Sequence, residues 1–221
     1  MAIVTIERHV KRINDRVAAG NRARLNEARL FAVNVLSAPG AGKTSLLERT
    51  IERLQPRLHV GVIAGDAETD FDTRRLARYD LPVVRILMHG GCHLDAKLIE
   101  RALDKFDLDA LDLILIENVD SLTCPVDVDL GEQLRVVVVS TDGGAEQLLQ
   151  YSAALRSAAA LVINKTDLAP FSHVDLKAMQ DQAQQMNPGL AVFETSCTTN
   201  AGVPEWSDWL ARHLSRSTIE R

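Results

Sequence analysis

Short apolar runs alternate with amphipathic segments through most of the 221-residue chain. Several runs are apolar at consecutive positions, as in Val136–Val139, which is typical of parallel strands buried on both faces. We therefore predict strands over Phe31–Leu36, Leu58–Ala64, Val83–Leu87, Leu113–Glu117, Arg135–Ser140, Ala160–Asn164 and Leu190–Thr195. The segments between them predict helices near residues 43–54, 70–79, 94–105, 173–186 and 204–214.

This alternation predicts an α/β fold with a doubly wound, mainly parallel sheet of about seven strands. Ligands of such sheets bind at the carboxyl ends of the strands. Residues 4–30 carry a looser helical pattern around Gly20 and predict one or two helices ahead of the sheet. We accordingly expect an N-terminal helical segment, residues 1–30, and a main domain, residues 31–214.

The charge balance narrows the class of partner. The chain has a net charge of −5 and a pI near 5.7, which argues against nucleic acid or an anionic membrane surface as the main partner. Residues 1–30 hold seven basic and three acidic residues, so the remainder has a net charge of −9. The basic segment either docks on an acidic partner or is simply a solvated helix face.

Nothing near the first residue resembles a signal peptide, and no apolar run approaches the roughly 20 residues that span a bilayer. We therefore expect a cytoplasmic protein with no membrane partner. Thiols stay reduced in that compartment. The three cysteines are then expected to be free thiols or metal ligands and not disulfides.

The first predicted strand runs into Ser-Ala-Pro-Gly-Ala-Gly-Lys-Thr at residues 37–44, and a helix follows. Small residues let backbone N–H groups curl around a phosphate, and the helix N-terminus is electropositive. This is the pattern of a P-loop, with Ser37 in place of its first glycine. Lys43 is expected to reach the β- and γ-phosphates, and the Thr44 hydroxyl to ligate Mg²⁺. The expected phosphate-binding residues are Ser37, Gly40, Ala41, Gly42, Lys43, Thr44 and Ser45.

A second loop, Asn164-Lys165-Thr166-Asp167, follows a strand and resembles the guanine-reading loop of P-loop GTPases. In those proteins the aspartate, here Asp167, accepts from the guanine N1–H and exocyclic amine. Adenine would leave that carboxylate unpaired, which gives strong discrimination. Asn164 would brace the loop, and the Lys165 stem would lie over the base. Ser196 and Cys197, after the last strand, match the place where a backbone N–H closes the pocket.

Carboxylates follow two other strands. Hydrolysis of a nucleotide needs a carboxylate for Mg²⁺ or its waters and a group that positions the attacking water. Asp66 and Glu117 are the first candidates and Asp72 the third, although each acid is alternatively a helix cap or a surface residue. The expected catalytic residues are Lys43, Asp66 and Glu117, and the expected Mg²⁺ ligands are Thr44, Asp66, Asp72 and Glu117.

A third group combines thiols and an imidazole. Cys92 and His93 follow two glycines after the third strand, and Cys124 lies seven residues after Glu117. Thiolate and imidazole ligands suit Zn²⁺ or Ni²⁺. Three ligands are one short of a tetrahedron, so a second chain, a water or His89 would supply the fourth. Buried structural cysteines are the alternative interpretation.

Together these motifs resemble the hydrogenase nickel-incorporation GTPases of the HypB type, over about residues 31–210. Beside the two nucleotide loops, the segments that carry the resemblance are Gly-Asp…Thr…Asp (65–72), Cys-His-Leu-Asp-Ala (92–96), Glu-Asn-Val (117–119), Cys-Pro (124–125) and Asp-Leu-Gly-Glu (129–132). The urease nickel GTPases are similar, but they have a histidine where Val126 stands here. The resemblance implies a P-loop NTPase domain of the SIMIBI class at residues 31–214.

The resemblance further implies a GTP-binding and GTP-hydrolysing metallochaperone that delivers nickel to a [NiFe]-hydrogenase large subunit with a maturation partner. It implies GTP/GDP, Mg²⁺ and Ni²⁺ or Zn²⁺ as ligands. It also implies a GTP-dependent homodimer with Cys92, His93 and Cys124 of two chains at a shared metal site. The thiol of Cys197 matches no metal pattern and is expected to be structural.

One departure keeps a second function open. Asp120 stands where the family usually has a glycine whose N–H meets the γ-phosphate, and an aspartate adds a like charge and a Cβ. A GTP-gated adaptor with weak or absent hydrolysis, or with a non-nickel client, is therefore the alternative. A small-molecule kinase is a third hypothesis, and the guanine-reading loop argues against it.

Overall fold

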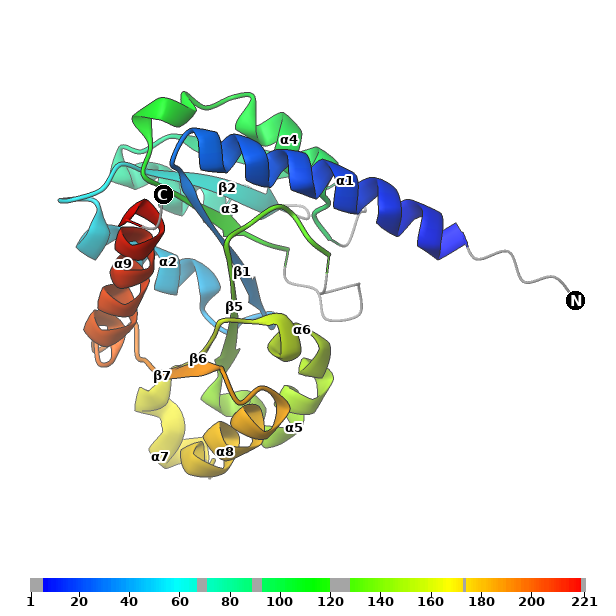
Figure 1. Ribbon diagram of the computed structural model, residues 1–221. Coiled ribbons are helices and arrows are strands. Elements are labelled where there is room, and N and C mark those ends of the chain that lie inside the picture. Colours follow the sequence, from blue (N-terminus) through cyan, green and yellow to red (C-terminus); the bar gives the residue numbers. More distant parts are fainter. Residues whose placement is uncertain (1–5, 67–70, 89–92, 120–127, 173, 220–221) are drawn as a thin grey trace, which may run out of the picture.

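The computed structural model describes residues 6–66, 71–88, 93–119, 128–172 and 174–219 (Figure 1). Seven strands form one sheet in the order β3-β2-β4-β1-β5-β6-β7, and all neighbouring strands are parallel. The strands are β1 (Phe31–Ser37), β2 (Val60–Asp66), β3 (Val83–Leu87), β4 (Leu113–Glu117), β5 (Leu134–Ser140), β6 (Ala160–Asn164) and β7 (Ala191–Glu194). The predicted α/β class and parallel seven-stranded sheet are confirmed.

Helices cover both faces of this sheet (Figure 1). The α-helices are α1 (Ile6–Glu27), α2 (Lys43–Leu54), α3 (Phe71–Leu76), α4 (Ala96–Leu103), α5 (Gly144–Gln150), α6 (Ser152–Ser157), α7 (Ala169–Ser172), α8 (Leu176–Met186) and α9 (Val203–Ile219). Four 3₁₀ turns complete the elements: η1 (Ala77–Tyr79), η2 (Leu108–Ala110), η3 (Thr141–Gly143) and η4 (Thr166–Leu168).

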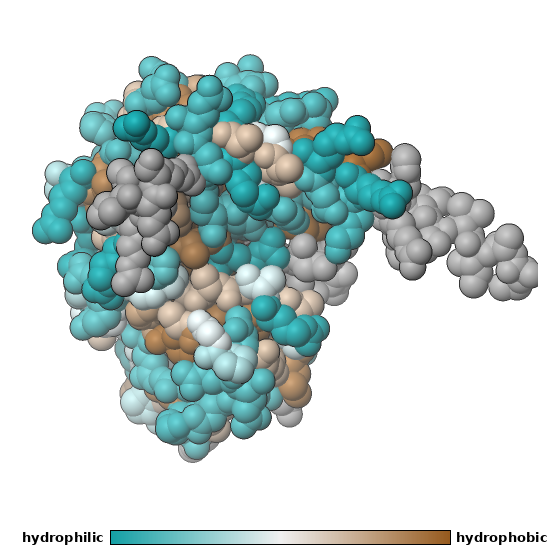
Figure 2. All heavy atoms as spheres, viewed as in Figure 1, coloured by the Kyte–Doolittle hydropathy of each residue, from teal (hydrophilic) through white to brown (hydrophobic). Residues whose placement is uncertain are grey.

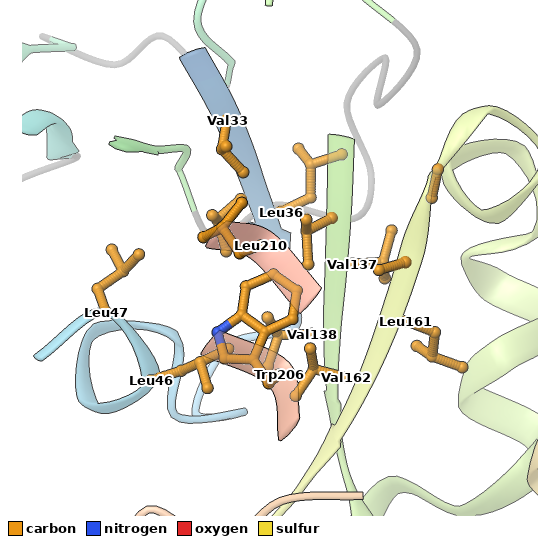
Figure 3. Packing of buried hydrophobic residues seen from close by; sticks show 14 of the residues in the cluster. Val33, Leu36, Leu46, Leu47, Val137, Val138, Leu161, Val162, Trp206 and Leu210 are labelled. Carbon is orange, nitrogen blue, oxygen red and sulfur yellow. The ribbon is translucent and has the colours of Figure 1, made fainter. Parts of the chain in front are cut away.

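The central strand β1 sends successive side chains to opposite faces, as a pleated strand must. Val33 and Val35 belong to the cluster that packs under α2 and α9, whereas Ala32 belongs to the cluster under α1 and α4. Figure 3 shows the first cluster, in which Trp206 of α9 lies beside Leu46 of α2. Strand β1 lies between β4 and β5 in the sheet. Because the three strands are parallel, the loops that follow them lie together at one edge of the sheet.

Helix α1 runs unbroken through Gly20 and packs on α4 (Figure 1). Two of its amides bridge the start of α4 and the segment before β5. Asn14 accepts from Ala96 N at 2.9 Å and donates to Asp129 O at 2.8 Å. Asn21 donates to Ala96 O at 2.8 Å and to Leu130 O at 3.0 Å. Helix α1 is therefore held against α4 and the segment before β5 by hydrogen bonds as well as by apolar packing.

Several element boundaries differ from the predictions. The second strand was expected at Leu58–Ala64 but spans Val60–Asp66, because Leu58 N bonds to Leu54 O and extends the turn that ends α2. Helix α4 begins at Ala96, after Asp95 caps it through Leu98 N, and not at residue 94. Helix α8 begins after Asp175, which caps it through Ala178 N.

The smaller helices α5, α6 and α7 were not predicted. The visible surface is mostly hydrophilic (Figure 2). Among the described helices, none combines the length and apolar content that a membrane crossing would require.

Candidate functional site

The loop between β1 and α2 has the backbone that a phosphate cradle requires. Gly40 and Gly42 have φ values of 72° and 87°, a region that residues with a Cβ seldom adopt. A Cβ at Gly42 would stand 2.5 Å from the Asn164 amide nitrogen, so glycine is needed there for space as well. Helix α2 then begins directly at Lys43, with its N-terminus at the loop. This geometry fits the predicted P-loop.

Glu117 is the meeting point of two P-loop side chains. Its Oε1 accepts from Lys43 Nζ at 2.9 Å and from Thr44 Oγ1 at 2.5 Å. Lys43 and Glu117 are only 5% and 2% exposed, so this ion pair lies in a low-dielectric environment. The other carboxylate oxygen, Oε2, is buried and has no hydrogen-bond partner within the described part of the chain. The arrangement therefore leaves one anionic oxygen beside the Thr44 hydroxyl for a ligand.

Asn164, at the end of β6, connects the base-reading loop to the P-loop. Its Nδ2 donates to Ala41 O at 2.9 Å. Its Oδ1 accepts from Thr195 Oγ1 at 3.1 Å and lies 3.4 Å from Cys197 Sγ. The side chain is buried and each end of its amide is engaged. Asn164 thus braces the loop as expected.

The base-reading loop itself is held from two sides. Lys165 has a positive φ of 61°, and its carbonyl accepts from Thr141 Oγ1 at 2.9 Å. Thr166 donates through N and Oγ1 to Thr195 O, at 3.0 and 3.1 Å. Asp167 is half-buried in the 3₁₀ turn that follows. The shape of the loop is therefore held by hydrogen bonds within the protein.

Ser196 and Cys197, which were expected to close the base pocket after β7, make hydrogen bonds within the protein. Ser196 N donates to Ala201 O at 2.9 Å, so that N–H is already used within the loop. Cys197 O accepts from Arg49 Nε at 3.0 Å. Burial raises the pKa of the Cys197 thiol to about 11, against a smaller opposing effect of its contact with Asn164. The thiol is therefore protonated near neutral pH, as expected for a structural cysteine.

The other predicted carboxylates are placed only through their backbone. Asp66 is the last residue of β2, and Asp72 lies in α3; their side chains lie outside the described part. Neighbouring Gly65 is close to β4, because a Cβ there would lie 3.2 Å from Glu117 O. The end of β2 is therefore beside the nucleotide loops, and the roles of Asp66 and Asp72 stay predictions.

Of the predicted nickel or zinc ligands, only His93 is described, half-buried just before α4. Cys92, Cys124 and the fourth-ligand candidate His89 lie outside the described residues, as does Asp120. Among the residues that are described, no three His, Cys, Asp or Glu side chains form a metal-binding group. The proposed cluster is thus a prediction that the structure does not test.

One contact beside the P-loop was not predicted. Arg75 of α3 donates to Ser45 Oγ at 2.9 Å and to Glu48 through Nε at 3.0 Å and through Nη2. The helical spacing of Ser45 and Glu48 on α2 was a visible signal of a polar face. Nothing in the sequence distinguishes Arg75 from its neighbour Arg74.

The comparisons with known proteins agree with this geometry. Residues 31–194 match the family model described as CobW/HypB/UreG, nucleotide-binding domain. The hydrogenase maturation factor HypB of Azotobacter vinelandii is 40% identical over 95% of this chain and 69% of its own. The probable hydrogenase maturation factor HypB of Methanocaldococcus jannaschii is 37% identical over 97% of both chains.

Two solved structures have the same fold over almost the whole chain. The crystal structure of hydrogenase maturation factor HypB from Archaeoglobus fulgidus has a TM-score of 0.85 at 41% identity, covering 91% of this chain and 98% of its own. That of HypB from Helicobacter pylori in complex with nickel has a TM-score of 0.86 at 28% identity, covering 92% and 95%. The chain therefore belongs to the CobW/HypB/UreG family and, within it, to the HypB group of hydrogenase maturation factors.

Proposed function

We propose that this protein is a GTP-hydrolysing metallochaperone that delivers nickel during the maturation of a [NiFe]-hydrogenase. The observation that carries the nucleotide-binding part is the convergence of Lys43 and Thr44 on buried Glu117, whose second oxygen has no partner among the described residues. Family membership supports the metal half, since one structural relative is a nickel complex.

The donor set fits a magnesium ion. Mg²⁺ prefers hard oxygen ligands and typically binds one or two carboxylates together with substrate phosphates. Thr44 Oγ1 and Glu117 Oε2, which has no donor within the described ranges, are such ligands, and Asp66 and Asp72 are the further candidates. When bound, the ion would neutralise developing charge on the phosphate oxygens.

The chain's own groups would do the rest of the work. The N–H groups of the P-loop and the start of α2 would bind the phosphates, and the Lys43 ammonium would stabilise the negative charge that grows on them. The Asp167 carboxylate would accept from guanine, with its loop held by Asn164. Glu117 would offer its second carboxylate oxygen to the cation, and Asp66 is the candidate for positioning the attacking water.

The nickel site would combine Cys92, His93 and Cys124, with thiolate and imidazole ligands that suit Ni²⁺ or Zn²⁺. We propose, as the resemblance to the HypB proteins implies, that two chains share this site in a GTP-dependent homodimer. A water or His89 is the alternative source of a fourth ligand. The hydrogenase large subunit and a maturation partner would receive the metal.

Nucleotide turnover is tested with Lys43→Ala, which removes the phosphate-binding charge and leaves buried Glu117 without its cationic partner, with the Thr44 hydroxyl as its donor. We expect kcat/KM for GTP to fall by about a hundredfold to a thousandfold. Lys105→Ala, at an exposed position after α4, is the control and should behave as wild type. Unchanged hydrolysis in Lys43→Ala, or a preference of the wild type for ATP over GTP, would contradict the proposal.

Metal binding is tested by adding Ni²⁺ to the metal-free protein and following the thiolate-to-nickel absorption with GTP, with GDP and without nucleotide. A saturable band should appear, change with GTP, and be lost in Cys92→Ala and Cys124→Ala. Cys197→Ala is the matched control for loss of a thiol. It is used only in the titration without nucleotide, because the Cys197 thiol lies beside Asn164 of the base-reading loop. Equal nickel affinity in all three states would remove the coupling.

A further inference from the structure

A polar face of α2 fastens the α3–η1 unit to the helix that starts at the P-loop. This face consists of polar residues at helical spacing: Ser45, Glu48, Glu52 and, directly after the helix, Gln55. Their partners are Arg75 and Tyr79. Arg75 bonds to Ser45 and Glu48, Tyr79 Oη donates to Glu52 at 2.8 Å, and Gln55 Nε2 donates to Tyr79 O at 2.6 Å. The two elements are therefore joined along three turns of α2.

The contact nearest the P-loop is partly protected from solvent. The Arg75 and Glu48 side chains are 23% and 19% exposed, so solvent screens this pair less than a fully exposed one. Arg75 uses its planar fork to reach both Glu48 oxygens and, through Nη2, the Ser45 hydroxyl as well. A lysine could not make this set of bonds, because an ammonium is a point charge.

Arg75 lies close to the candidate nucleotide site, so its hydrogen bonds bear on that site as well. Ser45 directly follows Thr44, which bonds to Glu117, so Arg75 is one residue removed from the candidate Mg²⁺ ligands. On its own element, Arg75 lies one turn after Asp72 in α3. The guanidinium thus joins the first turn of α2 to the helix that carries another candidate ligand.

We propose that Arg75 is a positioning residue for the magnesium–nucleotide site: it sets the start of α3 against the first turns of α2. This inference rests on the proposed GTPase function and adds a residue to it. Arg75 contacts neither phosphate nor guanine by this assignment. Its loss should weaken binding that depends on Mg²⁺, while binding of the base and its discrimination from adenine should persist.

The test compares Arg75→Gln and Arg75→Lys with Arg78→Gln, an exposed arginine three residues on. Binding of a non-hydrolysable GTP analogue is measured across a Mg²⁺ titration, and steady-state hydrolysis is measured in parallel. We expect both Arg75 variants to raise the half-saturating Mg²⁺ concentration by about tenfold, the scale of a small misplacement of binding groups. Affinity in EDTA and the GTP-to-ATP ratio should change by less than about twofold, and Arg78→Gln should match wild type.

A double-variant cycle separates positioning from folding. Glu48→Gln should raise the Mg²⁺ requirement in the same direction, and Arg75→Gln combined with Glu48→Gln should add little, because one contact is lost in each case. Equal loss of affinity with and without Mg²⁺, in step with a lower unfolding midpoint, would overturn the proposal. So would a Mg²⁺ requirement equal to that of Arg78→Gln.

The binding readout keeps this inference distinct from the proposed function. Wild-type protein that binds the analogue with Mg²⁺ but releases no phosphate would contradict GTP hydrolysis. The Arg75 comparison would still be decided by the analogue titration.

Discussion

Two buried residues, Asn164 and Glu117, end strands on opposite sides of β1, and their polar atoms are satisfied to different degrees. The Asn164 amide is engaged at both ends, with Ala41 O on one side and Thr195 and Cys197 on the other. Glu117 has one oxygen bound by Lys43 and Thr44 and one with no partner in the described part of the chain. A buried carboxylate oxygen without a donor is costly, and a bound ion is one of the explanations for such an atom.

The difference separates two tasks within one site. The Asn164 side is complete without ligand, which suits a loop that must hold its shape to discriminate between bases. The Glu117 side has one buried oxygen without a donor among the described residues, which suits the Mg²⁺ site that we propose. Substitutions at these two positions should therefore have different signatures, and the predictions below test that separation.

Of the substitutions that compare these two sides, Glu117→Gln is expected to have the largest effect, because it keeps the shape of the side chain and removes its charge. Turnover of GTP should fall by about a hundredfold, because a hard cation binds an amide oxygen more weakly than a carboxylate. The half-saturating Mg²⁺ concentration should rise, and the preference for GTP over ATP should not change. Steady-state hydrolysis across a Mg²⁺ titration measures both quantities, with Glu205→Gln on α9 as the exposed control. If Glu117→Gln lost the preference for GTP over ATP, the Glu117 and Asn164 sides of the site would not be independent.

A smaller effect with the opposite signature is expected for Asn164→Ala. Ala41 O would lose its donor and the Thr195 hydroxyl its acceptor, at a cost of about 1–3 kcal/mol in unfolding free energy. Affinity for GDP should fall, while the Mg²⁺ requirement of the remaining activity stays near that of wild type. Urea unfolding without nucleotide and GDP titration measure these effects, and Gln184→Ala, exposed on α8, controls for amide loss. An altered Mg²⁺ requirement would show that the two sides are not independent.

The smallest effect concerns pH. The Cys197 pKa is raised to about 11 by burial, above the ordinary thiol value of 9.0. Above pH 9 the unfolded chain releases this proton before the folded protein does, so stability falls as the pH rises toward 11. The contribution is complete below pH 9 and is small because the side chain is partly exposed. Between pH 8 and pH 10.5 the unfolding midpoint should fall further in the wild type than in Cys197→Ser. An equal fall in the two proteins would contradict the raised pKa of Cys197.

Prediction from sequence succeeded where chemistry imposes a local pattern. The P-loop needs small residues and a positive φ at Gly40 and Gly42, and a strand must precede it and a helix follow, so its place could be derived. Buried parallel strands such as β4 and β6 were predicted with correct bounds because their apolar runs are unbroken. The bracing role of Asn164 was implied by the resemblance to P-loop GTPases, and its hydrogen bonds to Ala41 O and Thr195 Oγ1 fit that role.

What the sequence did not reveal depends on contacts between distant segments. Helices α5, α6 and α7 span seven, six and four residues, too few turns for periodicity to stand out, and such short helices depend on tertiary packing. The hydrogen bond from Ser196 N to Ala201 O is a property of the turn and not of either residue type. Arg75 acquires its role only because the fold places α3 against α2.

The position of β1 in the sheet has a consequence for synthesis of the chain. Its two partners begin at Leu113 and Leu134, so the strand that leads into the P-loop is the first of the described strands to leave the ribosome and waits over the longest stretch of chain before it is paired. Non-local pairing of this kind slows folding and leaves an apolar strand exposed in the meantime. A nascent chain should therefore gain nucleotide affinity only after β5 has emerged, so that GTP acts as a late ligand of folding as well as a substrate.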